Sequence, residues 1–280
     1  MLGVAMILVV GDVVDDIGVR PLGTINAASD TEAEIRMTPG GSAANVAAWL
    51  GHLGSYARFV GKAGADGVLR HVDALSAHGV DARITADSEL PTATIVLTLD
   101  AAADRTMYVD RAANTTLRAT DLPTDIWNEI EWLHLTGYSF FDAGVRPIVL
   151  ELMAEARRRS IGISVDPSSL GFLQVAGRDE FLSWVADADL LFPNDDEQQF
   201  LQLEGKAVVT RGSDGATFGE HSVAASPSDV VDTTGAGDAF CAGFLSVWTK
   251  RREADDALAA GAKAAAECVA LRGARPVRAR

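Results

Sequence analysis

The pattern of apolar and polar residues divides the chain into short strands and amphipathic helices. Residues 4–11 form a continuous apolar run rich in valine, which is typical of a strand buried in a parallel sheet. Further strands are predicted over residues 58–61, 132–135, 162–166, 190–192 and 207–210. Helices are predicted over residues 43–53, 65–78, 145–159, 179–186, 239–250 and 253–271. Because strands and helices alternate, we expect a mostly parallel central sheet covered by helices on both faces.

Two segments interrupt this alternation. Residues 12–39 contain no long helical pattern, and their short alternating stretches predict small antiparallel strands. Residues 92–99 and 106–111 predict a β-hairpin joined by residues 100–105. We expect segments 12–39 and 90–112 to form a small sheet that is not continuous with the main core.

The composition and charge narrow the class of protein. Hydrophobic residues make up 48% of the 280 residues and charged residues 22%, as in ordinary globular proteins. The chain shows no internal repeat and no low-complexity linker, so we expect residues 1–280 to form a single domain. A net charge of −15 argues against a nucleic-acid or anionic-membrane partner, because the long-range field repels both.

The cysteines and the first apolar run indicate a location. Cys241 and Cys268 each lie in an apolar helical stretch, so both are predicted to be buried thiols in a reducing compartment. Residues 4–10 lack a preceding basic segment and are too short to cross a membrane. We therefore expect a cytoplasmic protein.

The most informative stretch runs from Val231 to Phe244. Gly235 and Gly237 precede an apolar pattern with helical spacing, so a helix is expected to begin near Gly237. Backbone N–H groups at the positive end of such a helix attract an anion, typically a phosphate. Asp238 would repel that phosphate unless it accepts a proton from the attacking hydroxyl. The simpler alternative is a glycine turn with an aspartate that favours the helix dipole.

Two polar clusters in the N-terminal part could bind hydroxyl groups. Asp12 and Asp16 follow the first strand, where carboxylates can accept hydrogen bonds from a sugar or polyol, although a solvated turn would look the same. Gly40 and Gly41 allow a ligand to approach the backbone closely, and Asn45 offers both a donor and acceptors. A plain helix N-terminus would account equally well for this second cluster.

Two more clusters follow predicted strands in the C-terminal half. Asn194 and Glu197 have the spacing of a capping box. Their functional alternative is a site for a hard cation, because magnesium prefers oxygen ligands. Residues 208–215 run from a strand into a glycine turn, whose exposed N–H groups could hold nucleotide phosphates or ribose. The chain lacks the G-x-G-x-x-G motif of dinucleotide-dependent dehydrogenases, the P-loop motif and the G-x-S-x-G motif of hydrolases. The sequence therefore does not indicate any of these three classes.

Together and in this order, these clusters resemble the ribokinase-like (PfkB) carbohydrate kinase family. Gly40, Gly41 and Asn45 match its N-terminal signature, and residues 232–238 match its more specific C-terminal signature. The resemblance extends from the first strand to Gly273. It implies a three-layer αβα sandwich with a small β-sheet lid, and transfer of the γ-phosphoryl group of ATP to a substrate hydroxyl.

The resemblance also implies roles for the matching residues. The general base would be Asp238, beside an anion hole of backbone N–H groups from Gly235, Ala236 and Gly237. Contacts to substrate hydroxyls would come from Asp12, Asp16, Gly40, Gly41 and Asn45. Contacts to ATP would come from Asn194, Thr210, Arg211, Gly212 and Gly215. Cation positions would be Glu197 for Mg²⁺ and, for the potassium-like ion that many members bind, Asp232 and Thr234.

The substrate is less determined than the reaction. Val14 stands where ribokinase has a polar residue, and residues 42–44 differ from the ribokinase form of the glycine turn, so ribose is not the expected substrate. The segment from Glu197 to Thr210 is unusually short, which would leave the nucleotide side more open. The predicted lid contains one aromatic residue, Tyr108, which favours a small sugar or sugar acid over a nucleoside that needs a stacking wall. Arg105 or Arg111 could meet the carboxylate of a sugar acid.

Two alternatives therefore stay open beside the sugar kinase. One is a nucleoside kinase of the same fold, and the other is a non-catalytic sugar-binding protein that keeps the kinase scaffold. Lid sheets of this kind can also pair between subunits, which makes a homodimer an expectation for this chain.

Overall fold

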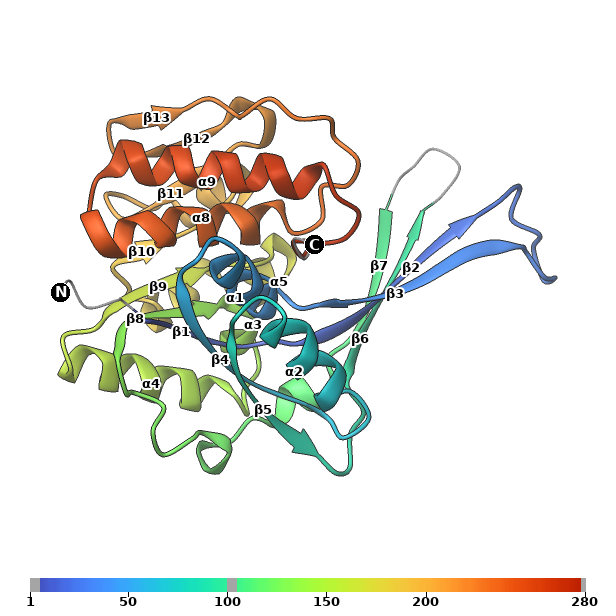
Figure 1. Ribbon diagram of the computed structural model, residues 1–280, viewed down its shortest axis with the longest axis horizontal. Helices are drawn as coiled ribbons and strands as arrows, with labels where there is room; N and C mark the ends of the chain where they lie inside the picture. Colours follow the sequence, from blue (N-terminus) through green and yellow to red (C-terminus); the bar gives the residue numbers. More distant parts are fainter. Residues whose placement is uncertain (1–5, 100–104, 278–280) are drawn as a thin grey trace.

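A six-stranded parallel sheet forms the centre of the protein (Figure 1). The computed structural model describes residues 6–99 and 105–277. The strands, in spatial order, are β10 (Leu190–Leu191), β9 (Gly162–Asp166), β8 (Ile130–Thr136), β1 (Met6–Val10), β4 (Tyr56–Gly64) and β5 (Asp81–Asp87). Every neighbouring pair is parallel. The chain adds β4 on one side of β1 and β8 on the other, so the order of strands reverses at β1.

Alternating side chains of β1 pack into two different cores. Ile7 and Val9 belong to the core beneath α1 (Ser42–His52), α2 (Val68–Ser76), α8 (Ala236–Arg251) and α9 (Ala254–Val269). Leu8 and Val10 belong to the core on the opposite face, beneath α3 (Gly137–Phe141), α4 (Arg146–Arg158), α5 (Leu170–Ala176), α6 (Arg178–Trp184) and α7 (Asp195–Leu201). The continuously apolar strand β1 therefore packs against helices on both faces of the sheet. This confirms the three-layer αβα sandwich.

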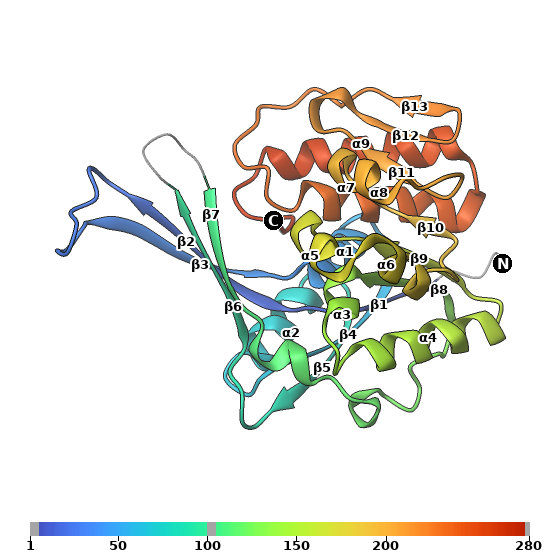
Figure 2. The ribbon, with the colours of Figure 1, turned by 180° about the vertical axis from the view of Figure 1, so that it is seen from behind.

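A second sheet of four strands projects from this body in both views (Figures 1 and 2). Its order is β3 (Ala33–Gly40), β2 (Val14–Pro21), β6 (Ala93–Leu99) and β7 (Arg105–Asp110). Two antiparallel hairpins are joined by the parallel pair β2–β6, which brings the two predicted segments into one sheet. We call this sheet the lid. Residues 100–104 of the predicted connection lie outside the described residues.

The lid is tied to the body by a buried ion cluster at its base. Asp15 of β2 is 5% exposed and accepts hydrogen bonds from Arg70 Nε and Nη2, at 3.1 and 2.5 Å. The Nε2 atom of His71 lies 3.1 Å from the same carboxylate. This cluster fixes the start of β2 against α2, and so fixes the end of the lid that lies closest to the central sheet.

Some elements differ from the sequence-based expectation. Pro39 and Gly40 belong to β3, and the turn comes at Gly41, whose φ of 95° favours glycine. Strand β5 was not predicted, because polar residues dominate its sequence. Strand β11 (Val208–Thr210) starts a three-stranded antiparallel sheet with β12 (Ala216–Phe218) and β13 (His221–Val223), which are too short to leave a period-two pattern. Short 3₁₀ helices cover Ala112–Thr116, Ala119–Asp121 and Gly212–Asp214.

Cys241 and Cys268 are both buried free thiols, as predicted. Within residues 6–99 and 105–277, no helix is long and apolar enough to cross a membrane.

Candidate active site

A cavity of about 630 Å³ lies where the central sheet, the lid and the start of α8 meet. Parallel strands bring their carboxyl ends to one edge, and ligands of open α/β sheets bind beyond that edge where the strand order reverses. Four strands contribute lining residues in this way, namely Asp12 after β1, Tyr138 after β8, Asp166 at the end of β9 and Asn194 after β10. The fold therefore brings together side chains that are far apart in the sequence.

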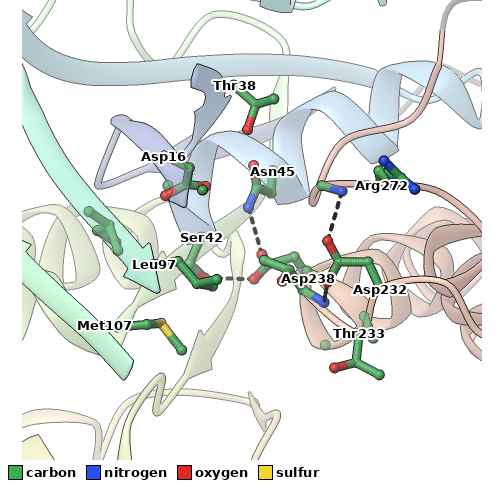
Figure 3. Close-up of a pocket in the computed structure, with 18 of the residues that line it drawn as sticks. Asp16, Thr38, Ser42, Asn45, Leu97, Met107, Asp232, Thr233, Asp238 and Arg272 are labelled. Atoms are coloured by element: carbon green, nitrogen blue, oxygen red, sulfur yellow. Dashed lines mark hydrogen bonds between the residues drawn. The ribbon is translucent and has the colours of Figure 1, made fainter. Parts of the chain in front are cut away.

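Asp238 lies in the first turn of α8 and faces α1 across the cavity (Figure 3). Its Oδ1 atom accepts a hydrogen bond from Ser42 Oγ at 2.7 Å. Its Oδ2 atom accepts one from Asn45 Nδ2 at 2.9 Å. Each oxygen of the carboxylate is therefore held by a donor from the same turn of α1, which fixes its orientation.

Burial raises the pKa of Asp238 from its ordinary value of 3.8 to about 7. The hydrogen bonds from Asn45 and Ser42 oppose this rise, and the nearby charges of Asp12 and Asp16 add to it. A carboxylate that titrates near neutral pH is well matched to accept a proton from a hydroxyl.

The loop before α8 exposes backbone to the cavity. Gly235, Ala236 and Gly237 all line it, and no side chain caps this helix. Gly235 has a φ of 78°, and a Cβ there would lie 2.5 Å from Ala274 Cβ, so glycine is required. A Cβ on Gly237 would meet no atom within 4 Å, so this residue faces open space. The positive end of α8 is thus open to an anion.

The carboxylate of Asp12 connects three elements. It accepts hydrogen bonds from the backbone N–H groups of Ser42, at 2.7 Å, and Ala43, at 3.2 Å. It also accepts one from Thr136 Oγ1 at 3.1 Å. Asp12 lines the cavity, and its bonds hold the start of α1 at the end of β8. Its contact with a substrate hydroxyl stays a prediction.

Asp16 lines the cavity from β2, next to the glycine pair. Burial raises its pKa to about 6, whereas the positive charge of Arg275 lowers it. A Cβ on Gly40 would lie 1.9 Å from Asp16 Oδ2, so the first glycine of the pair makes room for this carboxylate. Gly41 lines the cavity, whereas Gly40 does not. Asp16, Gly41 and Asn45 all line the cavity, and their contacts with a substrate hydroxyl stay a prediction.

Asn194 and Glu197 form the capping box of α7 and also line the cavity. The side chain of Asn194 accepts from Glu197 N at 2.9 Å, and Glu197 Oε2 accepts from Asn194 N at 3.0 Å. The capping box is confirmed, and the position of both residues in the cavity lining leaves the cation site a prediction. Burial raises the pKa of Glu197, and burial followed by the charges of Glu197 and Asp238 raises that of Asp166.

Buried Glu197 and half-buried Asp166 form an acidic wall that a cation would stabilise, so the donor set fits a magnesium ion held partly by phosphate and water. In the described part of the chain, no group of three or more His, Cys, Asp or Glu side chains could hold a metal ion by itself.

The predicted nucleotide turn reaches the cavity only at its first residue. Thr210 lines the cavity, whereas Arg211, Gly212 and Gly215 do not. Arg211 instead donates to Asp195 Oδ1 at 3.1 Å and to Thr217 Oγ1 at 2.7 Å. Contacts from this turn to a nucleotide stay a prediction.

The predicted site of a monovalent cation is a tightly bonded loop. Asp232 Oδ1 accepts from Thr234 N at 3.0 Å and from Thr234 Oγ1 at 2.7 Å. Asp232 Oδ2 accepts from Gly273 N at 3.0 Å, as the dashed line in Figure 3 shows. These bonds join the loop before α8 to the segment that follows α9.

The arginines at the cavity differ from those expected. Arg111 donates to the carbonyl oxygen of Tyr138 at 2.7 Å and does not line the cavity, and the side chain of Arg105 is outside the described residues. Arg20 and Arg36 of the lid line the cavity, and both pair with Glu34. Two cations share one carboxylate there, so these three side chains together carry one positive charge.

Sequence reasoning did not identify Ser42, Asp166 or Arg275 as parts of the site. Asp166 had a signal, because it ends a predicted strand in the way that Asp12 follows the first one. Ser42 follows the glycine pair and has the residue type of an ordinary helix cap, so its sequence context indicates no chemistry. Arg275 had no local signal, since its partners lie more than 200 residues earlier in the chain.

An open helix N-terminus and a proton acceptor that titrates near neutral pH suit one class of reaction, the transfer of a phosphoryl group to a hydroxyl. The chain belongs to the pfkB family of carbohydrate kinases, whose model matches residues 4–279. It is a carbohydrate kinase of this family, as the sequence motifs indicated.

Individual relatives cover most of the chain. A fructokinase from Escherichia coli is 29% identical over 248 residues, which are 78% of this chain and 79% of that protein. An ATP-dependent ribose-1-phosphate kinase from Halopiger xanaduensis is 32% identical over 254 residues, 82% and 81% of the two chains. Among solved structures, a candidate ribokinase II from E. coli in complex with ATP and Mg²⁺ superposes with a TM-score of 0.85 at 22% identity, over 96% and 94% of the two chains.

Proposed function

We propose that this kinase transfers the γ-phosphoryl group of ATP to a hydroxyl of a small sugar or sugar acid, with Asp238 as the general base. The observation that carries the proposal is the placement of Asp238. Its carboxylate is half-buried in the cavity wall, held by Ser42 and Asn45, directly beside the open N-terminus of α8. Residues 1–280 would act as one kinase domain with the lid over the sugar.

The reaction would proceed by in-line transfer. The attacking hydroxyl would donate its proton to Asp238, while N–H groups of residues 235–237 stabilise charge on the transferring phosphoryl group. Asp16, Gly41 and Asn45 would orient the sugar so that one hydroxyl faces Asp238. The lid would exclude water from the cavity and so limit hydrolysis of ATP.

Nucleotide and cations would occupy the side of the cavity formed by the C-terminal half. Asn194 and Thr210 would contact ATP, with Arg211, Gly212 and Gly215 nearby. Glu197, together with Asp166, would hold the waters of Mg²⁺. Bound with ATP, Mg²⁺ supplies neutralisation of phosphate charge. A potassium-like ion would lie by the loop of Asp232 and Thr234.

The inner face of the lid supports a sugar more than a nucleoside. Strand alternation directs Ile95, Leu97 and Met107 into the cavity, and Figure 3 shows Leu97 and Met107 on the lid side of Asp238. Tyr108 is paired with Val96 on the other face and does not line the cavity. The lid thus offers aliphatic contacts and no aromatic ring for a base.

Two arginines on the same face could meet the anionic group of a sugar acid or a phosphorylated sugar. Arg20 and Arg36 exceed their shared partner Glu34 by one positive charge. That excess could attract an anionic group of the substrate, and one relative is named as a kinase of ribose 1-phosphate. The aliphatic wall keeps a nucleoside as the second candidate, because it could cover one face of a base.

A screen of ATP consumption tests the proposal. Pentoses, hexoses, sugar acids, sugar phosphates and nucleosides would each be added with ATP and Mg²⁺, and product ADP measured. We expect turnover on a sugar-type substrate, and a loss of roughly 10²–10⁴-fold in Asp238→Asn with ATP binding retained.

The outcomes separate the alternatives. Turnover confined to nucleosides would replace the proposed substrate class. Near wild-type turnover in Asp238→Asn would remove Asp238 as the base. Binding of ATP with no turnover on any substrate would favour a sugar-binding protein.

Two further features go with the proposal. The donor ATP and the two free thiols suit a cytoplasmic location. The outer face of the lid exposes Ile35, Met37 and Tyr108, which we propose pair with a second copy of this chain.

A further inference from the structure

The segment that follows α9 passes directly behind the site. Arg275 in this segment is 9% exposed, although it is an arginine near the end of the described chain. Its Nε atom donates to Asn45 Oδ1 at 3.1 Å. Its Nη2 atom donates to the carbonyl oxygen of Gly40 at 2.7 Å. One guanidinium thus binds both the glycine pair and the asparagine that holds Asp238.

Neighbouring residues place Arg275 firmly. Gly273 N donates to Asp232 Oδ2 at 3.0 Å, which ties the segment to the loop before α8. The carbonyl oxygen of Ala274 accepts from Trp49 Nε1 at 2.9 Å, which ties it to α1. Ala274 also packs so closely on Gly235 that a Cβ at Gly235 would clash with it. The segment therefore has one position relative to both sides of the cavity.

The bond from Arg275 decides which way the amide of Asn45 faces. A guanidinium has donors only, so the atom of Asn45 that it meets must be the oxygen. The amide NH₂ group then faces Asp238 Oδ2 and donates to it at 2.9 Å. The opposite orientation would set two donors against each other at Arg275 and two acceptors against each other at Asp238. Arg275 and Asp238 thus select the same orientation of the asparagine.

Charge gives Arg275 a second effect on the site. The carboxylates of Asp16, Asp12, Asp238 and Asp15 all favour its charged form, so that burial lowers its pKa only to about 10 and it stays positive at neutral pH. In return, the positive charge of Arg275 lowers the pKa of Asp16. Without it, burial would leave Asp16 protonated over a wider range of pH.

We propose that Arg275 is a positioning residue for phosphoryl transfer, which orients the base Asp238 by holding the amide of Asn45. The inference rests on the proposed role of Asp238. It assigns a kinetic role to a side chain that does not line the cavity. A buried arginine that only fastens the segment after α9 would explain the same bonds without any effect on the chemical step.

The test compares Arg275→Met with Arg275→Lys and a matched control, Arg58→Met. Arg58 is 6% exposed and donates to Asp81 and to three backbone carbonyls away from the cavity. Both methionine variants remove a buried guanidinium, so both should lower Tm. We expect Arg275→Met to lower kcat roughly 10- to 100-fold, as misplacement of a reacting group does, with the KM for ATP nearly unchanged. Arg58→Met should keep the wild-type kcat.

The pH profile of kcat/KM tests the effect of the charge of Arg275 separately from its hydrogen bonds to Asn45 and Gly40. With the charge of Arg275 removed, the acid limb should shift to higher pH in Arg275→Met. Arg275→Lys keeps the charge and loses the forked geometry of the guanidinium. The acid limb of its pH profile should therefore stay near that of the wild type. Its kcat should fall between those of the wild type and Arg275→Met. It also keeps the test possible if the methionine variant does not fold.

A double-mutant cycle with Asn45→Ala locates the path of the effect. If Arg275 acts through Asn45, Arg275→Met should cost little more once Asn45 is alanine. Additive losses, or an unchanged kcat and pH profile in both Arg275 variants, would overturn the inference while leaving the proposed function in place. Full turnover in Asp238→Asn would instead overturn the proposed function, and the inference with it.

Discussion

Asp238 combines a catalytic advantage with a cost in stability. Its carboxyl group is partly removed from solvent and its pKa is raised to about 7, so the folded protein favours the neutral form more than the unfolded chain does. Ionisation therefore destabilises the folded state. The same burial makes the carboxylate a stronger base, because a high pKa means a high affinity for the proton of the substrate.

The stability of Asp238→Asn should depend on pH. The folded pKa lies above the ordinary 3.8, so the penalty is absent below about pH 4, grows between pH 4 and 7, and is complete above 7. Asparagine carries no charge, so the variant should be more stable than the wild type at pH 8, by up to about 4 kcal/mol. Thermal unfolding of both proteins between pH 4.5 and 8 measures the difference. A constant difference in Tm would contradict the raised pKa.

Alanine substitutions at the two glycines before Asp238 should affect different properties, stability at Gly235 and activity at Gly237. Gly235→Ala places a Cβ against Ala274 at a positive φ, and should destabilise the protein by about 1–3 kcal/mol. Gly237→Ala meets no protein atom, so its stability should match the wild type. Its methyl group would instead enter the cavity and displace the phosphoryl group, at a cost of roughly 10²-fold in kcat. Measuring Tm and kcat for both variants checks this, and full activity in Gly237→Ala would argue against an anion hole here.

At the scale of elements, α7 shows how one motif can serve folding and function together. The reciprocal bonds of Asn194 and Glu197 cap a helix of only seven residues. The same two side chains line the cavity, because the helix begins where β10 ends. The short segment after Glu197 therefore does not remove the motif from the site.

Glu197→Gln separates the two roles of this motif. Glutamine keeps an oxygen that can accept from Asn194 N, so α7 should persist. The lost charge should raise the Mg²⁺ concentration needed for half-maximal activity by roughly 10- to 100-fold. Asp196→Asn removes an exposed carboxylate from the same helix and is the control, with a much smaller expected effect. Equal Mg²⁺ dependence in the two variants would exclude Glu197 from the metal site.

At the scale of the whole molecule, the two faces of the lid differ in what they contact. Its inner face carries the aliphatic and charged residues of the cavity. Its outer face exposes Ile35, Met37 and Tyr108 by 66%, 58% and 61%. Exposed apolar side chains on a sheet with open edges favour association, and the net charge of −15 opposes it.

We expect a dimer through the lid that salt strengthens. Screening weakens the repulsion between two acidic chains, whereas contact between apolar faces persists. Sedimentation equilibrium at low and high salt measures the association constant. Met37→Lys should weaken it, and Leu69→Lys, at an exposed apolar residue of α2, should not. A protein that stays monomeric at all accessible concentrations would contradict the lid interface.

Most of the fold was predictable because it depends on local patterns. The alternation of apolar runs with amphipathic stretches identified β1, α1, α4, α8 and α9, since burial of a strand or a helix face leaves a periodic trace. β5, β12 and β13 escaped prediction. These strands are short or polar, and their pairing with distant strands, rather than their own sequence, stabilises them.

The sequence by itself determined the glycine turn and the aspartate at the start of α8, because glycines and a helix start are local features. It also determined that the lid segments are β hairpins. Only the tertiary structure decided that Asp166 joins the acidic wall, that Tyr108 faces away from the cavity, and that Arg275 holds Asn45 from 230 residues away. Such contacts depend on how strands and helices pack. The local sequence around one residue does not indicate which distant residue will contact it.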